Sequence, residues 1–209
     1  MSYQEIIFEN RAGVAILTLN RPDIRNAITG EATISEFEDA VGRVNADMTC
    51  RVLIIAAADP SFSAGGNVKD MAAKKGMFAG TPAQVMEGYR KNIQRIPLAV
   101  YGCAVPTIAA VNGPAIGAGC DLSLMCDMRV ASEKAKFGET FVSVGLIPGD
   151  GGAYFLPRVV GMARACELTF TGEVIDAQRA LEMGLVNYVA PHEALLEKAR
   201  ELAGRIAEK

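Results

Sequence analysis

The sequence contains no tryptophan, one histidine and no apolar run long enough to span a bilayer. A Ser-His-Asp or Cys-His catalytic centre would depend on that single imidazole, His192, for which a surface or capping role is favoured. The 21 basic and 24 acidic residues nearly balance, and the basic residues are scattered along the chain. Neither nucleic acid nor a membrane surface is therefore expected as a partner.

Paired cysteine motifs are also missing. The five cysteines are an odd number without a C-x-x-C pair, which argues against a zinc site and predicts free thiols in a reducing compartment. The first ten residues, MSYQEIIFEN, lack the apolar core of a signal peptide. We therefore expect a cytoplasmic protein without a metal site.

The most informative stretch is PTIAAVNGPAIGAGCDL, residues 106–122. Its apolar run predicts a buried strand, and Gly117 opens a predicted helix that ends near Met125. Unpaired N–H groups and the helix dipole at such a start favour an anion, or an oxygen that becomes an anion during a reaction. Asp121 follows about one helical turn inside. Close helix–sheet packing alone would equally explain the glycines.

Two further segments combine a turn with a helix start. SFSAGGNVKDM, residues 61–71, passes through small residues into a short helix that Asn67 can cap. Two such turns could direct two N–H groups at one oxygen, although a mobile glycine-rich loop is the alternative. In FVSVGLIPGDGG, residues 141–152, Asp150 is either an N-cap or an acid that lines a cleft.

Nucleotide-binding motifs are not present in these segments. Gly113, Gly117 and Gly119 are spaced G-x-x-x-G-x-G, whereas a dinucleotide fingerprint requires G-x-G-x-x-G. The Gly-Lys-Ser/Thr of a phosphate-binding loop is also missing. A dinucleotide-dependent oxidoreductase is therefore disfavoured.

Hydrophobic periodicity predicts a chain that mixes helices and strands. Strands are expected at residues 6–8, 14–19, 52–57, 108–111, 128–131, 135–138 and 186–189. Helices are expected at residues 29–45, 82–96, 117–125, 162–170, 176–183 and 193–208, with Pro97 ending or kinking the second. No linker divides the chain, so a single domain is expected.

The chain resembles the crotonase superfamily, the enoyl-CoA hydratase/isomerase family. The matching segments are LNRPDIRNA, SFSAGGNVKDM, PTIAAVNGPAIGAGCDLSLMCDMRVAS, KAKFGE, GLIPGDGG and LTFTGEVIDAQRALEMGLVNYV. They cover nearly the whole chain in the order found in the family. The resemblance implies an α/β fold, a spiral of β-β-α turns that forms one core domain over 1–209, assembled as a homotrimer or a dimer of trimers. Family chains usually continue with further C-terminal helices, so the resemblance also implies a truncated chain.

The resemblance further implies where substrate binds. Family members hold a thioester enolate between two backbone N–H groups, which correspond here to Ala64 and Ala118. Coenzyme A belongs to the substrate, and no cofactor is required. The residues implied for substrate and coenzyme A binding are Ile24, Arg25, Ala27, Ala64, Gly65, Gly66, Asn67, Gly117 and Phe141.

The acidic residues depart from the family pattern. Family hydratases carry glutamates where this chain has Asp121 and Phe141. Asp150 occupies the turn in which a related aryl-CoA dehalogenase has its nucleophilic aspartate. We therefore expect Asp121 and Asp150 to form a relocated acid/base pair, with Phe141 as a pocket wall.

The expected reaction is hydration of a 2-enoyl-CoA. An isomerase, thioester hydrolase, decarboxylase or dehalogenase remains an alternative within the resemblance. A non-catalytic acyl-CoA-binding subunit is the alternative from another class, because Phe141 replaces an acid.

Overall fold

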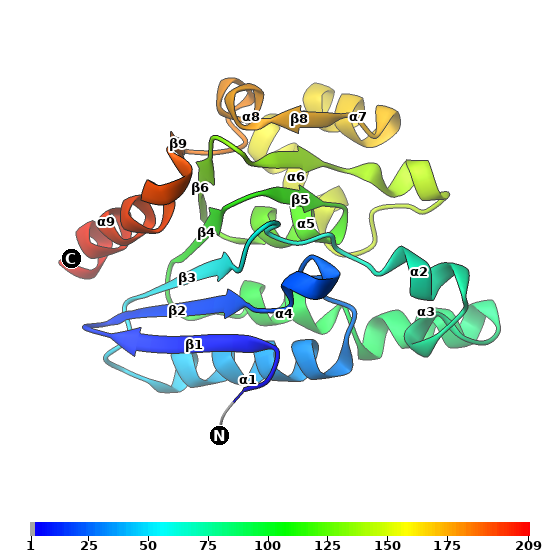
Figure 1. Cartoon of the computed structure of the whole chain (residues 1–209), viewed down its shortest axis with the longest axis horizontal. Coiled ribbons are helices and arrows are strands. Elements are labelled where there is room, and N and C mark those ends of the chain that lie inside the picture. The colour runs from blue at the N-terminus through cyan, green and yellow to red at the C-terminus, as the bar shows by residue number, and fades with distance from the viewer. Residues whose placement is uncertain (1–2) are drawn as a thin grey trace.

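A computed structural model describes residues 3–209 of the chain (Figure 1). The strands are β1 (Ile6–Arg11), β2 (Val14–Leu19), β3 (Val52–Ala57), β4 (Thr107–Val111), β5 (Pro114–Ile116), β6 (Met128–Ser132), β7 (Lys136–Gly138), β8 (Val174–Asp176) and β9 (Tyr188–Ala190). The α-helices are α1 (Glu31–Ala46), α2 (Val68–Ala72), α3 (Pro82–Lys91), α4 (Arg95–Tyr101), α5 (Ala118–Met125), α6 (Gly152–Val160), α7 (Met162–Thr171), α8 (Ala177–Met183) and α9 (Leu195–Ala207). Short 3-10 helices are η1 (Pro22–Ile24), η2 (Gly76–Phe78), η3 (Thr140–Val144) and η4 (His192–Ala194).

Two sheets organise the chain. The larger has the order β1-β2-β3-β4-β6-β9, and the smaller has the order β5-β7-β8. In the larger sheet β1 runs antiparallel to β2, whereas the remaining pairs are parallel. All five residues of β4 are buried, as expected for a central parallel strand covered on both faces.

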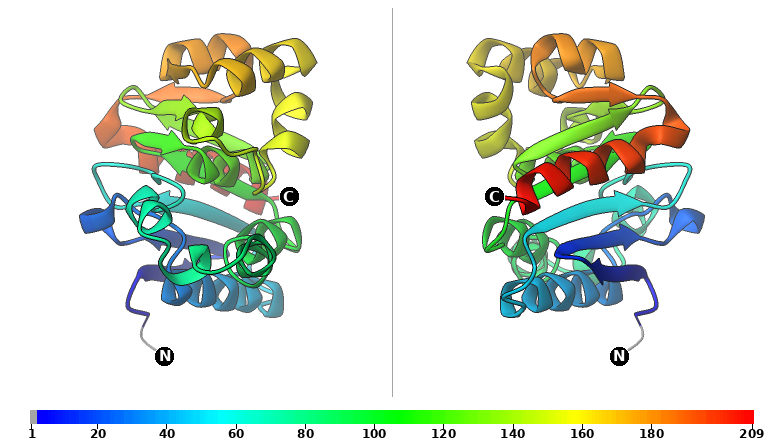
Figure 2. Two further views of the ribbon diagram at one scale, coloured as in Figure 1. Left: turned by 90° about the vertical axis from the view of Figure 1, so that its right-hand side faces the viewer. Right: turned by 90° about the vertical axis from the view of Figure 1, so that its left-hand side faces the viewer.

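Helices cover both faces of the larger sheet (Figures 1 and 2). Leu17, Ile55 and Ala109 belong to the main core with α1, α4 and α5, whereas neighbouring residues of the same strands face α9. This division follows from the alternation of side chains along a strand. Among residues 3–209, no helix is both long and apolar enough to cross a membrane.

Most predicted elements are confirmed, with three corrections. The helix predicted over 82–96 is wrong, because the chain breaks at Asn92 and a new helix begins at Arg95. Pro97 lies in the first turn of α4, where its missing N–H would have no helical partner. The short strands β5 and β8 were not predicted, since three residues carry too little periodicity.

The order of the strands brings the two predicted turns together. β3 and β4 are parallel neighbours, with Leu53 opposite Thr107, so their carboxyl ends lie at the same edge. The segment after β3 leads to Ser63, and the segment after β4 leads through β5 to α5. The candidate site is built where these segments meet.

Candidate active site

The turns at 63–66 and 116–119 are joined by main-chain hydrogen bonds. Ser63 N–H donates to the carbonyl of Pro114 over 3.1 Å, and Ile116 N–H donates to the carbonyl of Ser63 over 3.0 Å. The approach is so close that a Cβ on Gly119 would lie 2.2 Å from the oxygen of Ser63. Glycine at 119 therefore sets the spacing of the turns.

The predicted N–H donors have different surroundings. Ala118 is the first residue of α5, so its N–H has no partner within the helix. Ala64 N–H donates to the carbonyl of Arg25 over 2.9 Å and is therefore engaged. Gly66 N–H has no hydrogen-bond partner in residues 3–209. Main-chain geometry thus moves the first candidate donor from Ala64 to Gly66.

Both candidate donors border one cavity of about 80 Å³. Phe141 and Asp150 line it as well, so the side chain predicted as a pocket wall does lie there. A groove of about 1020 Å³ extends past Phe141 and Asp150 between α2, α3 and the segment after η3. Its further lining includes the apolar side chains Val68, Met71, Phe78, Val85, Met86, Leu146 and Ile147.

Asp150 is a buried carboxyl in the cavity wall. It is 4 % exposed, and burial raises its pKa to about 6. The helix that follows begins at Gly152 with no side-chain cap, so the N-cap alternative for Asp150 is wrong. Tyr89 lines the same cavity, and its pKa is raised by burial and by the charge of Asp150.

Asp121 lies deeper and does not line the cavity. Its carboxyl faces that of Glu139, which directly follows β7 and is 1 % exposed. Burial and the neighbouring charge of Glu139 raise the pKa of Asp121 well above its usual range. Sequence reasoning did not identify Glu139 as a site residue, although it ends the matching segment KAKFGE. The sequence signal that could have indicated Glu139 is an acid placed directly after Phe137 and Gly138, which are both buried.

The residues expected to bind coenzyme A surround the first turn. Arg25 is exposed and Ala27 is buried, in a loop whose Ile28 N–H donates to the carbonyl of Gly65 over 2.9 Å. Ile24 ends η1 beside them. Asn67 caps α2 by accepting from Lys69 N–H over 3.1 Å, which confirms the predicted cap.

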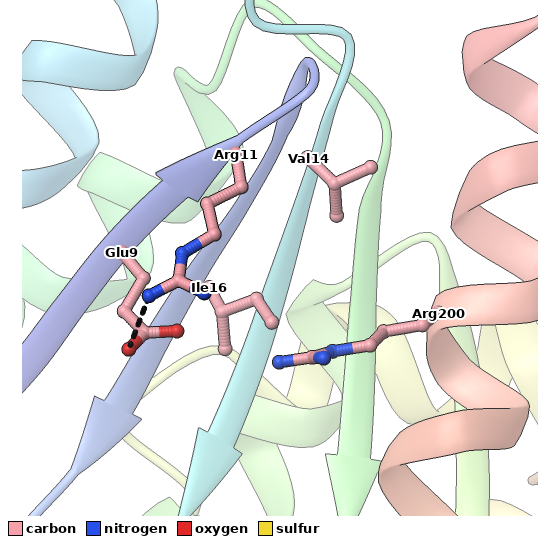
Figure 3. A pocket seen from close by; sticks show the side chains of 5 residues that line it. All are labelled: Glu9, Arg11, Val14, Ile16 and Arg200. Carbon is pink, nitrogen blue, oxygen red and sulfur yellow. Dashed lines mark ion pairs between the residues drawn. The ribbon is translucent and has the colours of Figure 1, made fainter.

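A second concavity lies between β1, β2 and α9 (Figure 3). Arg11 and Arg200 approach Ile16 from opposite sides, and Arg11 pairs with Glu9 at 3.9 Å. It contains none of the predicted site residues.

His192 joins Ser132 and Asp59 in a chain of side-chain contacts. Its Nδ1 lies 3.1 Å from Ser132 Oγ, and its Nε2 lies 3.1 Å from Asp59 Oδ2. Ser132 is fully buried and Asp59 accepts a hydrogen bond from Asn112, so these contacts connect η4 to the loop after β3.

Among residues 3–209, no cluster of histidine, cysteine or acidic side chains has the arrangement of a metal site.

Comparison with known proteins agrees with this geometry. The enoyl-CoA hydratase/isomerase family profile matches residues 9–209. The chain belongs to this family. A crotonyl-CoA hydratase of Syntrophomonas wolfei is 40 % identical over 210 residues, covering 100 % of this chain and 78 % of the relative. A short-chain-enoyl-CoA hydratase of Clostridium acetobutylicum is 36 % identical, covering 99 % and 76 %.

Solved structures confirm the crotonase fold. The crystal structure of enoyl-CoA hydratase from Bacillus anthracis has a TM-score of 0.88 and 36 % identity, covering 99 % of this chain and 78 % of that one. The α/β spiral expected from the resemblance is therefore present, and the chain is an enzyme of the hydratase type.

Proposed function

We propose that the enzyme adds water across the C2=C3 double bond of a 2-enoyl-CoA. The observation that carries this proposal is the convergence of three groups on one cavity: the N–H groups of Gly66 and Ala118, and the carboxyl of Asp150. Relatives that match nearly the whole chain are named as hydratases.

The two N–H groups polarise the thioester. Its carbonyl oxygen accepts from Gly66 and Ala118, and the positive end of the α5 dipole adds to the attraction. Negative charge grows on this oxygen as the enolate forms, so the donors stabilise the transition state more than the ground state. Removal of one such donor typically costs about 3–4 kcal/mol.

Two carboxyls then divide the proton transfers. Asp150, whose pKa is about 6, is ionised at neutral pH and takes a proton from water as the C3–O bond forms. The double-bond electrons move toward the thioester oxygen. As the carbonyl re-forms, the proton of Asp121, which lies behind the cavity wall, reaches C2 through one bridging water molecule. Asp121 lies three residues after Ala118, on the same face of α5. The proton gained by Asp150 restores that lost by Asp121 before the next turnover.

The remaining predicted residues would position the substrate. Phe141 lies 3.7 Å from the point where a Cβ of Gly117 would stand, so its ring shields the helix start from water. Gly65 and Asn67 would border the acyl-CoA path, with Ile24, Arg25 and Ala27 near the nucleotide. The reaction uses main-chain N–H groups and carboxyls of this chain, and coenzyme A enters as part of the substrate.

We also propose that residues 1–209 form one core domain in a cytoplasmic homotrimer or dimer of trimers. A parallel bridge pairs Ser63, in the segment after β3 of the larger sheet, with Ala115 in β5 of the smaller sheet, and this connection between the sheets supports one domain. Exposed apolar residues on η3 and α7, including Val144, Met162 and Phe170, offer surface for assembly. The five cysteines are free thiols, as expected in a reducing compartment.

The test is the loss of conjugated-thioester absorbance from crotonyl-CoA. We expect turnover by the wild type and a loss of about 10²–10⁴-fold in kcat for Asp121→Asn and for Asp150→Asn. Asp70→Asn makes the same chemical change outside the cavity and should leave kcat unchanged. An inert wild type that still binds crotonyl-CoA would exclude hydration of this substrate and favour another crotonase reaction or a binding subunit.

A further inference from the structure

Within residues 3–209, Glu139 is the one buried carboxyl near the cavity that the reaction above does not use. Asp121 Oδ1 and Glu139 Oε2 lie 2.2 Å and 2.9 Å from the point where a Cβ of Gly152 would stand. Both side chains therefore converge on the first residue of α6, two positions after Asp150. Asp150 is near enough for its charge to raise the pKa of Asp121, so acids from three separate segments interact here.

No basic side chain within residues 3–209 forms an ion pair with Asp121 or Glu139. All four of their carboxyl oxygens are buried, and none makes a hydrogen bond of ordinary geometry in that part of the chain. The donors that face them are the N–H of Gly152 and the thiol of Cys120, neither of which carries a positive charge. Arg129, the buried cation nearest in sequence, donates instead to carbonyls, including those of Cys126 and Leu185. Two buried carboxylates without a cation cannot both stay ionised, because desolvation and mutual repulsion add.

One proton between the two groups removes their repulsion and leaves a single buried negative charge instead of two. It converts the contact into an O–H···O hydrogen bond and gives each carboxyl a partner. We propose that Glu139 is a positioning residue that keeps this proton on Asp121, so that Asp121 is the acid and Asp150 the base. The catalytic meaning of this arrangement rests on the proposed hydration.

The surroundings of the pair are consistent with this direction of donation. Burial raises the pKa of Glu139, and the charge of Asp150 adds to this, whereas contacts with the Asp121 carboxyl and the Cys120 thiol act in the opposite direction. The pKa of Asp121 has no such neighbouring side chain to lower it and is raised further by the charge of Glu139, which favours the proton on Asp121. The thiol stays protonated because burial and the two carboxyls raise the pKa of Cys120 well above its usual range. Asp150 is the remaining titratable group that faces the pair, and its negative charge further raises the pKa of Asp121.

Glu139→Gln tests the role of Glu139 directly. The amide is nearly isosteric, removes the negative charge of Glu139 and can donate to Asp121, so both changes lower the pKa of Asp121 and favour its ionised carboxyl. At pH 8 the wild type should show the infrared C=O stretch of a protonated carboxyl, and Glu139→Gln should lose it. Asp150→Asn should retain this band, because Asp150 is already ionised at that pH. The exposed Glu133→Gln is the matched control and should also retain the band.

Kinetics supply the second readout. We expect Glu139→Gln to lower kcat on crotonyl-CoA by about 10- to 100-fold at pH 8, with KM within about twofold, and to regain activity as the pH falls and Asp121 is reprotonated. A band that survives in Glu139→Gln, or a lower kcat with an unchanged pH profile, would overturn the proposal. Loss of the band in a protein that does not hydrate crotonyl-CoA would support proton sharing and refute the hydration instead.

Discussion

Replacing Asp150 by asparagine should make the protein more stable while it loses activity. In the folded chain burial raises the Asp150 pKa from 3.8 to about 6. A tenfold change in proton affinity corresponds to about 1.36 kcal/mol, so the buried carboxyl lowers the free energy of unfolding by about 3 kcal/mol above pH 6. Asparagine has no proton to lose and avoids this penalty.

The sign follows from proton linkage. The folded state holds the Asp150 proton more tightly than the unfolded chain, so the contribution of Asp150 to stability falls as the pH rises from about 4 to about 6 and is then level. The gain in Asp150→Asn should therefore be about 1.5 kcal/mol at pH 5 and about 3 kcal/mol at pH 8. For a chain of this length the larger gain corresponds to a rise in Tm of about 6–12 °C.

Urea unfolding at pH 5 and pH 8 measures both values. Asp70→Asn serves as the matched control, because Asp70 is only half-buried and should show no such pH-dependent gain. An Asp150→Asn gain that is equal at the two pH values, or absent, would refute the conclusion that the Asp150 carboxyl is desolvated in the folded protein.

Three further substitutions test other parts of the molecule. Gly119→Ala should lower both stability and kcat, because its Cβ would lie 2.2 Å from the Ser63 oxygen. Its control is Gly42→Ala, which has no atom within 4 Å of the added Cβ and should raise the free energy of unfolding in urea by up to about 1 kcal/mol. Ala118→Pro removes one N–H at a helix position that tolerates proline and should lower kcat by about 10²–10³-fold. Met162→Pro makes the same change at the start of α7 and is the control. Equal losses of activity in the two variants would argue against the donor role of Ala118. His192→Ala should cost about 1–2 kcal/mol in urea unfolding and leave turnover of crotonyl-CoA unchanged, whereas a lost activity would give the Ser132–His192–Asp59 contacts a catalytic role.

The sequence was sufficient for features that depend on neighbouring residues. The strand at 52–57, the helix that begins near Ala118 and the cap at Asn67 each follow from local pattern. The free N–H of the first turn could not be located in this way, because Ala64 is engaged by Arg25, which belongs to another loop.

The buried acids likewise show which features the local sequence predicts and which depend on contacts between distant residues. Asp150 was ambiguous in sequence, since an acid before a helix fits a cap as well as a cleft, and only the position of the helix start excludes the cap. Glu139 was missed because its burial results from the meeting of α5 and α6 around Gly152, which involves residues distant in sequence. Contacts of this kind require the folded arrangement of the chain.

The close approach of the two turns has a consequence for how this site tolerates sequence change. The atoms proposed to hold the thioester belong to the main chain, so a small side chain at 66 or 118 can supply them as well as another. At 66 the closest atom to an added Cβ is the flexible end of Met71 at 2.3 Å, and at 118 the buried alanine shows that a Cβ fits. The neighbouring positions lack this freedom: a Cβ on Gly65 would lie 2.5 Å from the oxygen of Ile116, and Gly119 is equally confined. In a library of all single substitutions, activity should therefore be lost most sharply at positions 65 and 119, which adjoin the residues whose N–H groups bind substrate. A change at 66 or 118 is then weaker evidence for a lost oxyanion site than a change at 65 or 119.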